Sequence, residues 1–71
     1  MLRLTLKAAR VNANFSQKEV AEKLKISNKT LSKWEKGISM PKVDQINALC
    51  DLYGVTYDML IFLPYNPLKA E

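Results

Sequence analysis

Two consecutive helix-start signatures constrain the fold of this 71-residue chain more than any other feature. In the first, Ser16 is suited to cap a helix N-terminus, and Glu19 lies three residues later, as in a capping box. Phe15 and Val20 flank the cap at the spacing of a hydrophobic staple. The pattern predicts a short amphipathic helix over about residues 17–24.

The second signature follows almost at once. Ser27 is the expected cap, Ile26 and Leu31 form the staple, and Gly37 is a suitable helix stop. These residues predict a helix over about residues 28–36. Because only a few residues remain between the two helices, they should form a helix-turn-helix.

The second helix has two unlike sides. Leu31 and Trp34 fall on its apolar side at 100° per residue. Three lysines lie on the opposite side: Lys29, Lys33 and Lys36. A lysine face that serves solubility alone is the alternative interpretation. Gln17 and Asn28 place amide groups at two neighbouring helix N-termini, which attract phosphate, and this favours a nucleic-acid partner.

The distribution of charge agrees with an anionic partner. Residues 1–42 carry ten basic and three acidic side chains, whereas residues 43–71 carry one basic and four acidic side chains. The positive charge therefore gathers on the half that holds the two motif helices, which favours a polyanion. The chain has no apolar run near 18 residues and no signal-peptide pattern, so we expect a cytoplasmic protein without membrane contact.

Composition argues against catalysis and metal binding. Cys50 is the only cysteine and there is no histidine, which removes zinc fingers, disulfide scaffolds and Cys-His or Ser-His catalysis. With Gly37 and Gly54 as the only glycines, there is no Gly-rich phosphate loop. We expect neither an enzyme nor a bound cofactor or metal.

Several separated motifs resemble the phage repressor and Cro (XRE-like) family of helix-turn-helix DNA-binding domains, over about residues 2–63. They are Leu6-Lys7-Ala8-Ala9-Arg10, Phe15-Ser16-Gln17-Lys18-Glu19-Val20-Ala21, Ser27 to Gly37, Pro41, and Leu52-Tyr53-Gly54-Val55-Thr56. The resemblance implies a lambda-repressor-like fold whose second motif helix enters the major groove of DNA. It also implies a repressor that acts by occluding transcription.

We accordingly expect an all-α, compact five-helix domain without a sheet over residues 1–63, and a short C-terminal tail over residues 64–71. Beside the two motif helices, the first helix should end near Asn12, the fourth should run from Pro41 to Gly54, and a staple around Thr56 predicts a last helix over about 57–62. The expected core is Leu6, Phe15, Val20, Ala21, Leu24, Ile26, Leu31, Trp34, Val43, Ile46, Leu49, Val55 and Leu60.

Three turn positions carry separate expectations. In the turn over residues 12–14 an asparagine can take the left-handed conformation usually given to glycine. Lys25 replaces a glycine that the family often has between the motif helices, so it either takes the left-handed backbone with some strain or permits a different turn. Lys42 stands where relatives commonly have a Ser or Thr cap, which leaves the fourth helix less well capped.

The docking mode implied by the resemblance assigns the DNA contacts. Expected base contacts are Asn28, Lys29, Ser32 and Lys33. Expected phosphate contacts are Gln17, Ser27, Lys36 and Lys42. Asparagine can pair with adenine N6 and N7, lysine can reach guanine O6 and N7, and Ser32 could instead reach a phosphate. Gln17 could be an ordinary exposed residue, and Lys36 and Lys42 could be simply solvated.

The resemblance also implies a partly buried ion pair between Arg10 and Glu35. Such a pair adds little net stability compared with apolar substitutes, but loss of one partner strands the other charge.

Useful specificity for a DNA sequence normally requires two DNA-binding domains on a near-palindromic operator, so we expect a homodimer at least on DNA. The candidate dimer surface is apolar: Met59, Ile61, Phe62, Leu63, Tyr65 and Leu68. The alternative is that residues 63–68 fold back over the core.

We interpret the chain as a sequence-specific transcriptional regulator, a phage- or prophage-type repressor. The other hypothesis is a protein-binding module that pairs with another repressor or a toxin.

Overall fold

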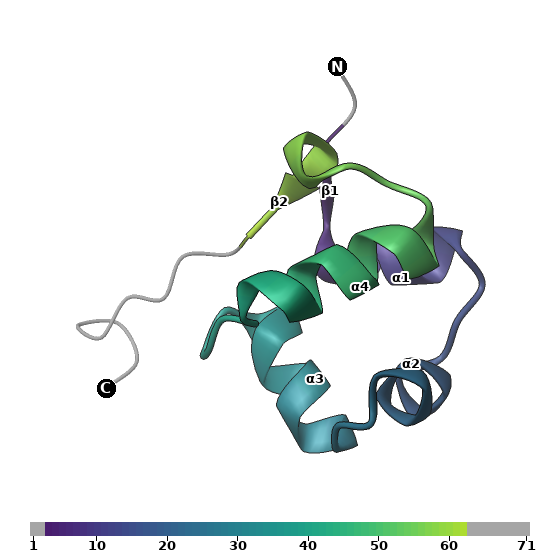
Figure 1. Ribbon diagram of the computed structural model, residues 1–71, viewed down its shortest axis with the longest axis vertical. Coiled ribbons are helices and arrows are strands. Elements are labelled where there is room, and N and C mark those ends of the chain that lie inside the picture. The colour runs from purple at the N-terminus through teal and green to yellow at the C-terminus, as the bar shows by residue number, and fades with distance from the viewer. Residues whose placement is uncertain (1–2, 63–71) are drawn as a thin grey trace.

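The computed structural model describes residues 3–62, which form four α-helices, one short 3-10 turn and a two-stranded sheet. The elements in chain order are β1 (Leu4–Thr5), α1 (Leu6–Asn12), α2 (Gln17–Leu24), α3 (Asn28–Lys36), α4 (Val43–Tyr53), η1 (Tyr57–Met59) and β2 (Leu60–Ile61). In Figure 1 the sheet and η1 lie at one end, α2 and α3 lie at the other, and α1 and α4 lie between them. The predicted bounds of both motif helices are confirmed.

The two strands join the beginning of the described chain to its end. They are parallel, with Leu4 opposite Leu60 and Thr5 opposite Ile61. Thr5 is extended, and its hydroxyl accepts a hydrogen bond from the Ala8 N–H at 3.1 Å, so the same residue ends β1 and caps α1. The sheet is therefore continuous with the start of the helical core.

The prediction of five helices and no sheet was wrong at the C-terminal side. Thr56 makes no side-chain cap, only a three-residue 3-10 turn follows it, and Leu60 returns to extended geometry. The Val55–Leu60 staple pattern does not distinguish a helix from this arrangement, because both bury Leu60. Leu60 and Ile61 adopt an extended backbone because they pair with β1, and a strand also suits their apolar side chains.

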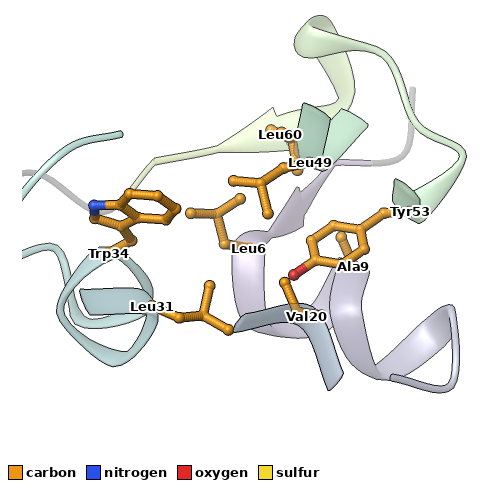
Figure 2. Packing of buried hydrophobic residues seen from close by; sticks show 8 residues of the cluster. All are labelled: Leu6, Ala9, Val20, Leu31, Trp34, Leu49, Tyr53 and Leu60. Carbon is orange, nitrogen blue, oxygen red and sulfur yellow. The ribbon is translucent and has the colours of Figure 1, made fainter. Parts of the chain in front are cut away.

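The buried core is contributed by all four helices and by β2. Its cluster consists of Leu6, Ala9, Val20, Leu31, Trp34, Leu49, Tyr53 and Leu60, drawn in Figure 2. Ala21 and Ile46 are also buried, while Phe15, Leu24, Ile26 and Val55 are partly buried against the cluster. Val43 was wrongly placed in the core and is 74% exposed, because it begins α4 and the buried face of that helix starts only at Ile46.

The turn between α1 and α2 is confirmed as a left-handed asparagine turn. Asn14 has φ 65°, and its N–H donates to the Val11 carbonyl at 3.0 Å. Asparagine tolerates this region better than most residues, so the turn costs little strain. Within residues 3–62 no helix has the length and apolar character needed to cross a membrane.

Candidate nucleic-acid interface

Helix α2 begins with a complete capping box. The Ser16 hydroxyl accepts a hydrogen bond from the Glu19 N–H at 3.1 Å, and the Ser16 N–H donates to Glu19 Oε1 at 2.9 Å. The bond from the Ser16 N–H to Oε1 lowers the pKa of Glu19, because it stabilises the carboxylate form. The capping box fixes the direction in which α2 leaves the preceding turn.

The turn between the motif helices uses a left-handed lysine. Lys25 has φ 59° and ψ 44°, which decides between the two alternatives left open by the sequence. The following N–H of Ile26 donates to the Ala21 carbonyl at 2.9 Å. Lysine replaces glycine here with some backbone strain, and the compact turn is retained.

Helix α3 is capped at both ends. The Ser27 hydroxyl accepts from the Thr30 N–H at 3.1 Å and lies 3.0 Å from the Thr30 hydroxyl, while Gly37 ends the helix with φ 77°. Ser27, expected to contact phosphate, is exposed but already uses its hydroxyl as the helix cap. The start and end of α3 are therefore fixed by local hydrogen bonds.

The two sides of α3 differ as the helical periodicity predicts. Leu31, Trp34 and Glu35 are buried, and Ser32 is half-buried at the boundary. The exposed candidate DNA contacts on this helix are Asn28, Lys29, Lys33 and Lys36. Three ammonium groups thus face solvent from a helix whose opposite side is anchored in the core.

An ion pair connects α1 to the inner side of α3. Arg10 Nε lies 2.7 Å from Glu35 Oε2, and Arg10 Nη2 donates to Glu35 Oε1 at 3.4 Å. Both residues are 8% exposed. A further Arg10 N–H donates to the Phe15 carbonyl at 2.9 Å, which ties the α1–α2 turn to the same pair.

Gln17 belongs to this network, which the sequence did not indicate. Its side-chain Nε2 donates to Glu35 Oε1 at 2.9 Å, so Gln17 is half-buried and not an ordinary exposed residue. The Glu35 carboxylate thereby connects the first residue of α2 to α3. The only available signal was the placement of Gln17 at the start of a helix that packs on α3.

The hydroxyl of Tyr53 is buried near this network. It has no hydrogen-bond partner among residues 3–62. Burial raises the pKa of Tyr53 above its usual range, and the negative charge of Glu35 adds to the increase while Arg10 opposes it. Figure 2 shows the ring directed into the core from α4.

The remaining expected contact residues are Lys42 and the candidate dimer surface. Lys42 is exposed, makes no side-chain cap, and donates its backbone N–H to Gln45 Oε1 at 2.8 Å. Of the candidate dimer surface, Ile61 is 40% exposed, and Met59 and Phe62 are half-buried at the sheet end of the molecule. Leu63, Tyr65 and Leu68 lie outside the described residues.

Comparison with known proteins agrees with this arrangement. A family model described as helix-turn-helix matches residues 6–60, which include all four α-helices. The HTH-type transcriptional regulator ImmR of Bacillus subtilis (strain 168) is 45% identical over 56 residues, covering 79% of this chain and 44% of the relative. The HTH-type transcriptional activator BcrR of Enterococcus faecalis is 32% identical over 56 residues, covering 79% of this chain and 28% of the relative.

The chain spans less than half the length of these two curated relatives. The matched segment nevertheless contains the two capped motif helices and the network that joins them to α1. On this evidence the chain belongs to the phage-repressor and Cro-type (XRE-like) helix-turn-helix family.

Proposed function

We propose that this chain is a sequence-specific DNA-binding transcriptional regulator that inserts α3 into the major groove of its operator. The observation that carries the proposal is the exposed cationic side of α3 on a helix anchored through Leu31, Trp34 and Glu35. A rigidly held helix of this kind is the reading element of helix-turn-helix proteins. The relatives named as transcriptional regulators support the same role.

In this proposal the N-terminal part of α3 reads bases. Asn28 offers a bidentate amide for adenine, and Lys29 and Lys33 offer ammonium groups for guanine. Ser27, Lys36 and Lys42 contact backbone phosphates around the helix. Gln17 contributes its backbone N–H at the start of α2, since its side-chain amide already donates to Glu35.

The chain acts as a dimer on a near-palindromic operator, with the two recognition helices about 34 Å apart. The apolar side chains of Met59, Ile61 and Phe62 support a dimer contact at the sheet end. Binding over a promoter represses transcription by occlusion. One relative is named as an activator, so a reporter assay has to measure the direction of regulation.

The test begins with selection of tight-binding duplexes from a random pool by the purified chain. Fluorescence anisotropy on a selected duplex should show log K falling with log salt at a slope of about −4 to −5 for a dimer, from two or three phosphate contacts per subunit. Lys33→Gln should weaken binding and relax the preference at one base position in each half-site.

Lys23→Gln is the matched control, because it also removes one positive charge. Lys23 belongs to α2, and its Nζ lies 5.9 Å from the centre of the Phe15 ring. Sedimentation of the free chain and of the complex reports the oligomeric state. Flat salt dependence, or duplex binding only after a second protein is added, would contradict the proposal and favour a protein-binding module.

A further inference from the structure

An open recess of about 480 Å³ lies where the first three helices meet, beside the lysine side of α3. It is lined by Lys7 and Arg10 of α1, Gln17 of α2, and Ser32, Glu35 and Lys36 of α3. Most of these residues belong to the two motif helices or to the ion-pair network. Lys7 does not, and neither its sequence position nor the motif pattern assigns it a role.

The side chains that line the recess carry a net positive charge, which favours the binding of an anion. The one carboxylate, Glu35, is compensated by Arg10 at 2.7 Å and by the Gln17 amide at 2.9 Å. Among residues 3–62, Arg10–Glu35 is the only ion pair. The ammonium groups of Lys7 and Lys36 are therefore left without a carboxylate partner in the described part of the chain, and both side chains are exposed.

The position of Ser32 adds a neutral donor to the same place. Ser32 is half-buried at the edge of α3, next to the recess and away from the fully exposed side of the helix. Ser32 lines the recess, and its hydroxyl can donate to a group that enters it. Because the Ser32 side chain is short and lies at this boundary, it is better placed to reach the recess than the floor of the DNA major groove.

We infer that the recess holds one backbone phosphate of the DNA duplex, bound by Lys7, Lys36 and the Ser32 hydroxyl. The inference rests on the proposed function and extends the DNA contacts from the motif helices to α1. Arg10, being buried and paired, positions the walls and does not contact the phosphate. Because phosphate contacts carry no base information, this site sets the register of α3 in the groove.

The first experiment compares Lys7→Gln with Arg3→Gln on a selected duplex. Arg3 is an exposed cation that lines a different recess, with Tyr57 and Ile61 at the sheet end, so it controls for the loss of one charge. Lys7→Gln should weaken binding to all duplexes by a similar factor and reduce the salt slope by about 1 per subunit. Arg3→Gln should leave the slope unchanged.

The second experiment identifies the phosphate itself. Methylphosphonate replacement, one linkage at a time, removes the charge of a single phosphate in each half-site. The wild-type chain should lose affinity at the linkage that enters the recess, and Lys7→Gln should show a much smaller loss there while keeping the losses at other linkages. Lys7→Arg should restore both the slope and the sensitivity to that linkage.

The outcomes separate the inference from the proposed function. If the wild-type chain binds duplexes and Lys33→Gln impairs binding, but Lys7→Gln keeps the full salt slope and the full methylphosphonate losses, the recess is not a phosphate site. If the wild-type chain shows no salt-dependent binding at all, the proposed function itself fails. Equal thermal melts of Lys7→Gln and wild type exclude unfolding as the cause of a loss.

Discussion

The two ends of this molecule are stabilised in different ways. At the motif end, formed by α2 and α3, short-range side-chain hydrogen bonds from Ser16 and Ser27 cap both helices. At the sheet end, formed by β1, η1 and β2, the equivalent Thr56 makes no cap, and order comes from pairing Leu4 with Leu60 across the length of the described chain. Local signals therefore specify the two motif helices, and long-range strand pairing joins residues 4–5 to residues 60–61.

The electrostatic character of the two ends differs as well. The motif end contains the exposed lysines of α3 and buried Glu35, which is paired with Arg10 of α1, whereas the sheet end exposes Tyr57 and Ile61. In the proposed function, the lysine side of α3 contacts DNA and the sheet end contacts a second copy. The predictions below address this division.

Glu35→Ala should cause the largest loss, because it strands the buried Arg10 charge and frees the Gln17 amide. Breaking a buried pair in this way costs about 3–5 kcal/mol of unfolding free energy. Arg10→Ala should cost a similar amount, while Glu22→Ala, at an exposed position of α2, should change little. Urea denaturation measures all three, and wild-type midpoints for both pair variants would contradict the structural role of the pair.

Leu60→Ala should produce the next largest loss, because it truncates the side chain that β2 contributes to the core. Leu60 is 3% exposed in the core, so truncation should cost about 2–4 kcal/mol of unfolding free energy. Ile61→Ala, at its 40% exposed neighbour, is the control and should cost well under half as much in the free monomer. Equal losses for the two variants would show that the strand is held by its backbone more than by its buried side chain.

Ser27→Ala tests the difference in capping directly. It removes the hydroxyl that accepts from the Thr30 N–H, and should cost about 1 kcal/mol of unfolding free energy. Thr56→Ala is the matched change at the sheet end, because Thr56 makes no cap bond, and it should cost clearly less. Thermal melts of the two variants decide the matter, since a larger loss for Thr56→Ala would reverse the assignment of local and long-range stabilisation.

Tyr53→Phe should have the smallest effect at neutral pH, because its buried hydroxyl has no partner among the described residues. Removing such a group should leave stability unchanged or slightly raised. The pH dependence is more informative. Because the pKa of Tyr53 is raised in the folded state, the unfolded chain releases its proton first, and stability is lost as pH rises above the ordinary tyrosine value of about 10.

Tyr53→Phe should remove this loss of stability at alkaline pH. Tyr57→Phe, at an exposed tyrosine, is the control and should retain it. Denaturation midpoints measured between neutral and strongly alkaline pH make the comparison. If Tyr53→Phe and wild type lose stability in parallel above pH ~10, the hydroxyl of Tyr53 is not the group responsible.

The features that sequence predicted well are those decided within a few residues. Ser16 and Ser27 begin helices because a hydroxyl three residues before a backbone N–H can bond to it whatever the rest of the chain does. Gly37 and Asn14 take left-handed conformations for equally local steric reasons. The amphipathic periodicity of α3 likewise indicated which residues would be buried and which lysines exposed.

The features that sequence missed depend on partners distant along the chain. Leu60 was expected in a helix because its staple pattern is satisfied there too, and only the presence of β1 favours a strand. Val43 shares the helical phase of Ile46, but the core does not extend to the first turn of α4. The link from Gln17 to Glu35 arises from the crossing of α2 and α3, which no local pattern reports.

The sequence by itself therefore determined the helix-turn-helix and the cationic side of its second helix, because caps, turns and helical periodicity act over three to five residues. Tertiary structure alone decided that residues 4–5 and 60–61 would pair as strands, that Glu35 would bind Gln17 as well as Arg10, and that Lys7 would border a recess with Lys36. These contacts depend on how the helices pack against one another, and no pattern within a few residues specifies that packing.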